Sequence, residues 1–164
     1  MPSLIAEESR TSAAAPPPGL LVDKTWVRRY GERVPALIHT CYRVLDLDRS
    51  IAFYEKLGFE EIGRIPIRKE AINAFLGLPG DGDPRLELTY NFDQEEPYEI
   101  GTGYGHIAIT TDDMDETLER LAALGIEPEK PPYTIRDGGS RLCFVSDPDG
   151  YRIEILEHPG STEG

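Results

Sequence analysis

One spacing occurs twice in this chain of 164 residues. His39 precedes Glu87 by 48 positions, and His106 precedes Glu154 by the same 48 positions. A single histidine in a strand-like apolar run is more often a hydrogen-bonded core residue than a ligand. The recurrence of a histidine and a glutamate at one spacing is what requires a different explanation, because it indicates an internal duplication.

A shift of 67 positions places the first half of the chain on the second. His39 falls on His106, and no gap is needed through the strand and helix that follow. Three pairs of segments correspond under this shift: residues 39–51 with 106–118, residues 57–60 with 124–127, and residues 85–88 with 152–155. Because one offset serves both ends of each half, we predict two tandem modules over residues 34–100 and 101–158.

Each module is expected to contain a strand, a helix and about three further strands, which makes the chain an α+β protein. In the first module Asp46 or Asp48 can cap the helix, and Gly58 can end it. The strands of the first module are expected near residues 37–45, 59–67, 71–78 and 85–90, and the last hairpin of the second module turns at residues 147–150.

The two ends of the chain differ from the modules. Residues 11–19 are rich in alanine and proline, so residues 1–20 are expected to be mobile or draped over a partner. Residues 20–30 include Trp26 and Tyr30, which suit either an arm packed on the core or on another subunit, or a disordered tail. We therefore treat residues 1–33 as an N-terminal arm and residues 159–164 as a tail.

The composition excludes several classes of function. The net charge of −13 opposes binding to nucleic acid or to an anionic membrane, and no apolar run approaches the length of about 20 residues that spans a bilayer. No secretory signal is recognisable, and two cysteines are too few for a disulfide framework, so a cytoplasmic setting is expected. Of the two, Cys143 is expected in the core, and Cys41 is interpreted as a small buried residue rather than one that lines a site.

Both glutamates are flanked by large aliphatic residues. Because side chains alternate across a strand, these neighbours are expected to pack beneath the helices while the glutamates face the other side. A carboxylate on a partly buried face needs a cation or a metal. Two nitrogens from His39 and His106 and two oxygens from Glu87 and Glu154 suit a borderline divalent ion with open positions for water.

An ordinary salt bridge is the alternative for each glutamate. Arg85 lies two positions before Glu87, and Arg152 lies two positions before Glu154, so each arginine shares a face with its glutamate. Salt bridges leave unexplained why a histidine recurs 48 positions before each glutamate, so the metal site is the preferred interpretation.

In these residues and the segments around them, the sequence resembles the glyoxalase I family (lactoylglutathione lyases) of the vicinal oxygen chelate superfamily. The resemblance covers about residues 35–158. The segments that carry it are residues 39–44, 49–54, 86–91, 101–108 and 147–154. The Asp-Pro-Asp-Gly turn at residues 147–150 is common to the superfamily, whereas Glu-Leu-Thr-Tyr-Asn at residues 87–91 and Gly-Tyr-Gly-His-Ile-Ala at residues 103–108 are typical of the lyases.

The resemblance implies two βαβββ modules that form a cup-shaped mixed sheet around one metal ion held by His39, Glu87, His106 and Glu154. It implies a homodimer, in which many family members build each site from both subunits. The implied reaction converts the hemithioacetal of methylglyoxal and glutathione into S-lactoylglutathione, with the metal stabilising negative charge on the substrate oxygens. Glu154 matches the base that moves the proton, and Glu87 is its symmetric counterpart.

The resemblance also implies substrate contacts and a metal class. Arg43 and Asn91 match positions that hold the glutathione moiety. Histidine at position 39 resembles the nickel- or cobalt-activated class, whereas zinc enzymes usually have glutamine there. The family often carries a basic residue before the paired glycines of the second module, but Asp137 stands there in this chain, which leaves the thiol open.

Three other functions of the same fold remain as alternatives. An epimerase or an extradiol dioxygenase would also use a metal, and the dioxygenase site of two histidines and one carboxylate has no need of Glu87. A small-molecule-binding module would need no metal, which four ligand residues argue against.

Overall fold

The computed structural model describes residues 37–158. Every element below belongs to one compact unit that begins at Ile38. The predictions for the N-terminal arm and for the tail at 159–164 lie outside the described residues.

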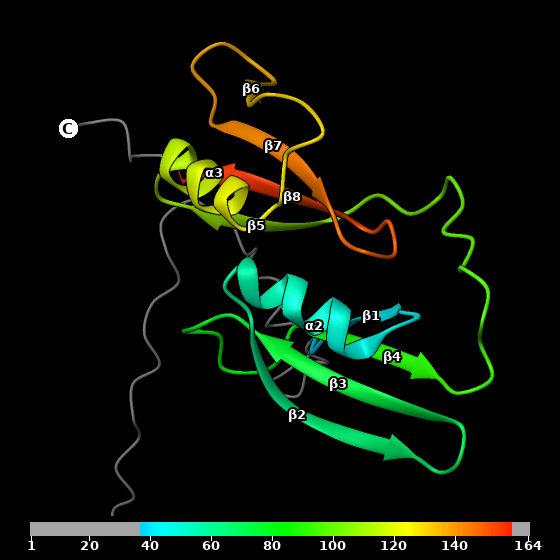
Figure 1. Ribbon diagram of the computed structural model, residues 1–164. Helices are drawn as coiled ribbons and strands as arrows, with labels where there is room; N and C mark the ends of the chain where they lie inside the picture. Colours follow the sequence, from blue (N-terminus) through cyan, green and yellow to red (C-terminus); the bar gives the residue numbers. More distant parts are fainter. Residues whose placement is uncertain (1–36, 159–164) are drawn as a thin grey trace, which may run out of the picture. The chain divides into compact units, whose positions relative to one another are not determined.

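The first module contains one helix and four strands (Figure 1). In chain order these are β1 (Thr40–Arg43), α2 (Leu47–Lys56), β2 (Glu60–Ile67), β3 (Ala71–Gly77) and β4 (Leu86–Asn91). The strands lie in the order β1-β4-β3-β2. β1 runs parallel to β4, and the other two pairings are antiparallel.

The second module repeats this arrangement. Its elements are β5 (Ile107–Thr111), α3 (Met114–Ala123), β6 (Tyr133–Thr134), β7 (Arg141–Ser146) and β8 (Arg152–Glu157), and its strands lie in the order β5-β8-β7-β6. The same order in both sheets confirms the tandem βαβββ modules and the α+β class. The structure thus contains two separate four-stranded mixed sheets, one in each module, rather than one continuous sheet.

Both helices begin at a capping aspartate and are followed by a glycine with positive φ. The carboxylate of Asp46 accepts a hydrogen bond from the backbone N–H of Arg49, and Asp113 accepts one from Glu116. These contacts satisfy amides that a helix leaves unpaired at its start. Gly58 follows α2 with a φ of 97°, a left-handed conformation that favours glycine.

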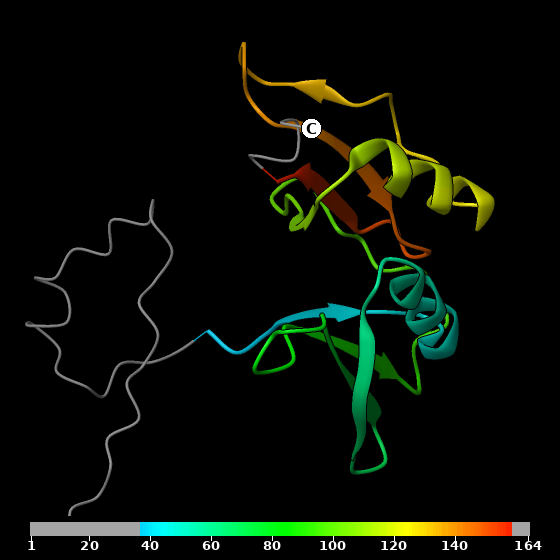
Figure 2. The same ribbon diagram turned by 90° about the vertical axis from the view of Figure 1, so that its left-hand side faces the viewer.

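The two helices lie on the same side of the sheets (Figures 1 and 2). The aliphatic neighbours of the two glutamates are buried in the core, as predicted: Leu86, Leu88, Ile153 and Ile155 are each at most 1% exposed. Cys143 is also in this core. Because strands alternate their faces, burial of these neighbours turns Glu87 and Glu154 toward the side away from the helices.

The turn between β7 and β8 joins the second module to α2 of the first. Asp149 accepts hydrogen bonds from the backbone N–H of Leu45 (3.1 Å) and from the Ser50 hydroxyl (3.0 Å). Asp147 accepts one from the Tyr54 hydroxyl (3.0 Å). Burial raises the pKa of Asp147 above its ordinary value, although Tyr54 and the backbone N–H of Tyr151 oppose that rise.

Aromatic rings add to the same contact between the modules. The rings of Tyr42 and Tyr151 stack with centroids 4.1 Å apart, and the Tyr42 hydroxyl hydrogen-bonds that of Tyr104. Burial also raises the pKa of Tyr54. These contacts fix the helix side of one module against the turn of the other.

Among residues 37–158, no helix combines the length and apolarity needed to cross a membrane.

Candidate metal centre

The first predicted pair meets at the start of β1. His39 immediately precedes β1, and Glu87 lies on β4, the strand that pairs with β1. The His39 Nε2 atom lies 3.0 Å from Glu87 Oε2. The histidine side chain is 30% exposed and the glutamate side chain 12%. The edge-on ring of Phe75, 5.9 Å away between centroids, supports the imidazole.

The second pair has the same geometry. His106 immediately precedes β5, Glu154 lies on the neighbouring strand β8, and His106 Nε2 is 3.0 Å from Glu154 Oε2. Phe144 contacts the imidazole edge-on with centroids 5.1 Å apart. The duplication has therefore preserved the histidine, the glutamate and the supporting phenylalanine.

Each pair suits two adjacent ligands of one ion. Ligand nitrogen and oxygen atoms sit roughly 2.1 Å from a divalent first-row metal, so two of them at right angles are about 3.0 Å apart. The observed separations of 3.0 Å match that value. The same length also suits a direct hydrogen bond, so each pair is satisfied when no ion is bound.

One chain does not bring the two pairs together. Within residues 37–158, no three side chains of His, Cys, Asp or Glu converge as a metal site would require. Each module thus supplies half of the predicted four-residue set, and the halves of one chain remain separate.

The arginine alternative fails for the second glutamate. Arg152 donates to both carboxylate oxygens of Glu129, at 2.8 and 2.7 Å, and its guanidinium lies over the Phe144 ring. This pairing lowers the pKa of Glu129. In the first module the side chain of Glu87 contacts His39, Asn73 and Thr89, and the Cys41 thiol also lies within hydrogen-bonding range of it.

Two of these contacts were missed from the sequence. Asn73 Nδ2 donates to Glu87 Oε1 at 2.8 Å, and the Thr89 hydroxyl donates to the same oxygen at 3.0 Å. Thr89 lies two positions from Glu87, so strand alternation placed it on the correct face. Asn73 lies on another strand, and only the register of β3 on β4 brings it there.

The interpretation of Cys41 as a buried residue was wrong. Cys41 is exposed, and its sulfur lies 3.3 Å from the Thr89 hydroxyl. It sits opposite Glu87 in the β1–β4 register. Partial desolvation of the sulfur raises the pKa of the thiol, which favours the protonated form.

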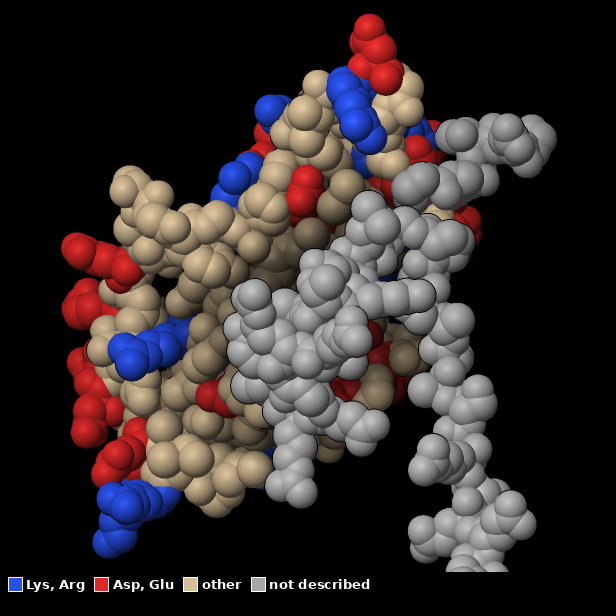
Figure 3. All heavy atoms as spheres, turned by 180° about the vertical axis from the view of Figure 1, so that it is seen from behind, with Lys and Arg blue, Asp and Glu red and all other residues tan. Residues whose placement is uncertain are grey.

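The predicted substrate residues lie on the same two strands. Arg43 ends β1 with an exposed side chain, and Asn91 ends β4. The Asn91 amide donates to the Tyr98 hydroxyl at 2.8 Å. On the side opposite that of Figure 1, several acidic side chains gather along the left-hand edge of the described surface (Figure 3).

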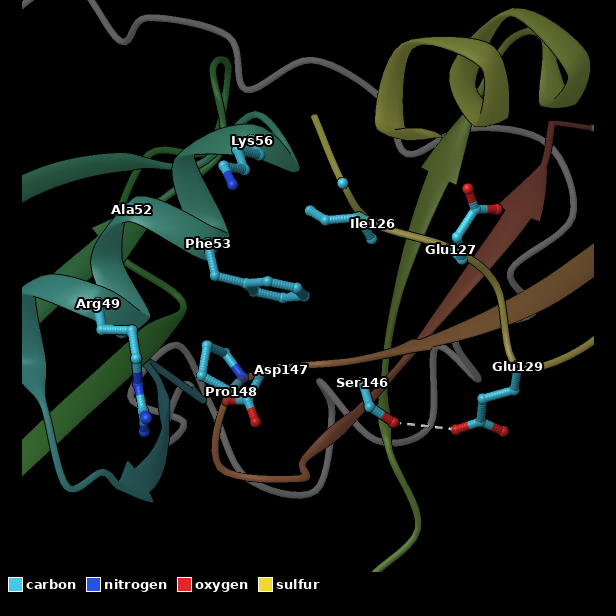
Figure 4. Close-up of a pocket in the computed structure, with 11 residues that line it drawn as sticks. Arg49, Ala52, Phe53, Lys56, Ile126, Glu127, Glu129, Ser146, Asp147 and Pro148 are labelled. Atoms are coloured by element: carbon cyan, nitrogen blue, oxygen red, sulfur yellow. Dashed lines mark hydrogen bonds between the residues drawn. The ribbon is translucent and has the colours of Figure 1, made fainter. Parts of the chain in front are cut away.

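A pocket of about 550 Å³ lies elsewhere, on the helix side between the modules (Figure 4). Arg49, Phe53 and Lys56 of α2 face Ile126, Glu127 and Glu129 across it. Most of its charged groups are already engaged: Glu129 pairs with Arg152, Arg49 with Asp149, and Lys56 with the carbonyl of Leu124. None of the predicted site residues lines it.

Residues 36–155 match the model of the Glyoxalase/Bleomycin resistance protein/Dioxygenase superfamily. The chain belongs to this superfamily. Both the tandem modules and the paired histidine and glutamate residues are therefore features of a superfamily member. The resemblance to glyoxalase I is also confirmed by named relatives.

Relatives from plants and bacteria carry the name lactoylglutathione lyase. The protein from Haemophilus influenzae is 41% identical over 78% of this chain and 96% of its own length. A probable chloroplastic lactoylglutathione lyase from Arabidopsis thaliana is 38% identical over 97% of this chain but only 44% of its own length. The chain thus spans about half the length of the plant relatives it matches.

Solved structures support the same assignment. Glyoxalase I from Zea mays superposes with a TM-score of 0.68 at 35% identity, over 74% of this chain and 44% of that one. The trypanothione-dependent glyoxalase I of Leishmania major has a TM-score of 0.62 at 37% identity, over 76% and 87% of the two chains.

Proposed function

We propose that this superfamily member is a lactoylglutathione lyase that converts the methylglyoxal–glutathione hemithioacetal into S-lactoylglutathione. The observation that carries the proposal is the repeated pair: in each module a histidine nitrogen and a glutamate oxygen lie 3.0 Å apart at the same place in the sheet. The lactoylglutathione lyases among the relatives, at 36–41% identity, support the choice of reaction.

We infer that each active site is completed by a second copy of the chain. His39 and Glu87 of one chain meet His106 and Glu154 of the other, and a homodimer contains two such sites. The separation of the two pairs within residues 37–158 of one chain supports this arrangement, because a pair alone offers only two ligands. Both histidines keep about a third of their surface exposed, which leaves room for a partner.

The donor set fits one divalent metal ion. Two imidazole nitrogens and two carboxylate oxygens suit nickel or cobalt, with zinc as the alternative. When bound, such an ion supplies Lewis-acid stabilisation for negative charge on the substrate oxygens.

The remaining work falls to the side chains. Glu154 takes the proton from one substrate carbon through a carboxylate oxygen and returns it to the adjacent carbon. Glu87 holds the equivalent position in the other half of the site. The apolar residues beneath both glutamates keep these strands in place.

Arg43 and Asn91 are proposed to hold the thiol part of the substrate. The net charge of −13 disfavours an anionic substrate in general, so its carboxylates need a local cation. Arg43 lies on the same face of β1 as Cys41, beside the Glu87 network, and has no resolved carboxylate partner among the described residues. A cytoplasmic setting stays a prediction from the cysteine content.

A direct assay tests the reaction. Methylglyoxal and glutathione are mixed with protein loaded with nickel, and formation of the thioester is followed over time. Parallel reactions with another thiol test whether glutathione is the thiol of the substrate. This test is needed because Asp137 stands at a position where the glyoxalase I family often has a basic residue. Metal binding without thioester formation would point to an epimerase or a dioxygenase, and small-molecule binding without metal would point to a binding module.

A further inference from the structure

The two glutamates occupy equivalent places but have unlike neighbours. In the first sheet Phe75 lies opposite Glu87 and Asn73 lies opposite Thr89. In the second sheet the equivalent pairs are Phe144 with Glu154 and Leu142 with Leu156. The register therefore equates Asn73 with Leu142 and Thr89 with Leu156.

The carboxylate of Glu87 is held at both oxygens. Oε2 faces His39, and Oε1 accepts hydrogen bonds from Asn73 at 2.8 Å and from Thr89 at 3.0 Å. Two donors on one oxygen oppose rotation of the carboxylate about its last side-chain bond, because turning would break both contacts.

Cys41 completes this network. Its sulfur is 3.3 Å from the Thr89 hydroxyl. A hydroxyl has a single proton to donate. The Thr89 hydroxyl lies within hydrogen-bonding distance of two acceptors, Glu87 Oε1 and the side-chain oxygen Oδ1 of Asn73. If the thiol donates to the hydroxyl oxygen, the hydroxyl proton is left for Glu87.

The carboxylate of Glu154 has no such support. Leu142, Leu156 and Ala108 occupy the places of Asn73, Thr89 and Cys41, and none of these three side chains can donate a hydrogen bond. Within residues 37–158, the polar side-chain contact of Glu154 is with His106. Among these residues, no second side-chain donor fixes the orientation of this carboxylate.

We propose that Asn73 and Thr89 are positioning residues that hold Glu87 in a fixed metal-binding orientation. The inference rests on the proposed function. The second module has no counterpart of this support, because Leu142 and Leu156 stand at the equivalent positions.

The experiment measures nickel(II) binding to metal-free protein by competition with a coloured chelator, in the absence of substrate. Asn73→Ala and Thr89→Val each remove one donor to Glu87, and Thr89→Ser keeps the hydroxyl as the matched control. Loss of a group that orients a ligand typically costs about 10–100-fold in metal affinity. We expect Asn73→Ala and Thr89→Val to lose that amount and Thr89→Ser to remain near the unmodified protein.

Two further readouts separate positioning from folding. Thermal unfolding of the metal-free variants shows whether they are merely destabilised, and kcat and KM at saturating nickel show whether substrate binding has changed. We expect a lower kcat with little change in KM. The proposal is overturned if nickel affinity is unchanged in both Asn73→Ala and Thr89→Val. It is also overturned if Thr89→Ser loses as much nickel affinity as Thr89→Val.

The same data distinguish failure of the proposal from failure of the proposed function. Protein that binds nickel with Asn73- and Thr89-dependent affinity but forms no thioester supports the positioning role and rejects the lyase reaction. Protein that forms thioester, but whose nickel affinity is unchanged by substitution of Asn73 or Thr89, supports the lyase reaction and rejects the positioning role. Unmodified protein that binds no nickel rejects both.

Discussion

His39 Nε2 and Glu87 Oε2 lie 3.0 Å apart, although 48 positions of sequence separate the two residues. The parallel pairing of β1 with β4 brings them together, because it places residue 41 beside residue 87. The pairing of β5 with β8 does the same for His106 and Glu154. Each module is therefore a self-contained half of a site, and the predictions below follow from that division.

Sites shared between chains predict complementation between two inactive variants. His39→Ala damages the first half-site, and Glu154→Ala damages the second. In a dimer of one chain of each kind, one site carries both lesions and the other carries none, so activity should partly return after subunits exchange. The measurement is thioester formation before and after mixing, with exchange verified by mass-tagged chains. Exchange without recovery would show that each site forms within one chain.

Metal removal should abolish activity, and loss of a ligand from either half-site should weaken metal binding. We expect about one divalent ion per chain, complete loss of activity on chelation, and best recovery with nickel or cobalt. His39→Ala and His106→Ala should each weaken nickel binding, because each removes one of four ligands. Elemental analysis and reactivation with single metals check this. Full recovery with zinc alone would contradict the assignment of metal class.

Glu154→Gln should separate the base from the ligand. The amide keeps an oxygen that can approach a metal but cannot accept the substrate proton. A positioned general base contributes about 10²–10⁴-fold in rate, so kcat should fall by that order while the dimer and bound nickel remain. Glu87→Gln should cost less in rate and more in nickel affinity, because Asn73 and Thr89 fix Glu87 as a ligand. Near-normal kcat in Glu154→Gln would transfer the role of base to another group, with Glu87 the first to test.

The contact between the modules predicts a loss of stability in Tyr54→Phe. The Tyr54 hydroxyl is the side-chain donor to the buried Asp147. Its removal leaves that carboxylate short of one partner, which costs about 1–3 kcal/mol of unfolding free energy. Urea unfolding measures the change, and Tyr133→Phe on the two-residue strand β6 serves as the control. Equal stability of the two variants would mean that the hydrogen bond contributes little.

Acid should weaken the fold in a manner that depends on Glu157. The Arg141 guanidinium, 2.7 Å away, lowers the pKa of Glu157 from 4.5, and the backbone N–H of Met114 adds to the effect. On acidification the unfolded chain takes up this proton first, so the stabilisation is complete above 4.5 and is lost as the pH falls through the lower folded pKa. Asp147, whose pKa is raised, contributes in the opposite direction.

Glu157→Gln therefore should make the acid-induced loss of unfolding free energy shallower. The measurement is denaturant unfolding at several pH values from about 7 to about 3, with and without the substitution. An unchanged slope would show that Arg141 and Glu157 do not control stability in acid.

The sequence alone determined the duplication, the α+β class and the four candidate ligands. It could do so because a fixed 67-residue offset and strand alternation are both properties of residue order. Alternation also placed Leu86 and Ile153 in the core and thereby turned Glu87 and Glu154 to the opposite face. The end of the first helix at Gly58 followed from local backbone preferences, whereas the sequence left Asp46 and Asp48 as alternative caps and the structure shows Asp46 in that role.

Only the tertiary structure decided which groups surround each glutamate. The Asn73 contact depends on the register of β3 against β4, and the commitment of Arg152 to Glu129 depends on the loop before β6. Cys41 was misjudged because residue type favours burial, whereas the exposed face of β1 overrides that preference. Local patterns fix which face a side chain occupies, but its neighbours on that face come from distant strands. The difference between the hydrogen-bond partners of Glu87 and those of Glu154 therefore came only from the tertiary structure.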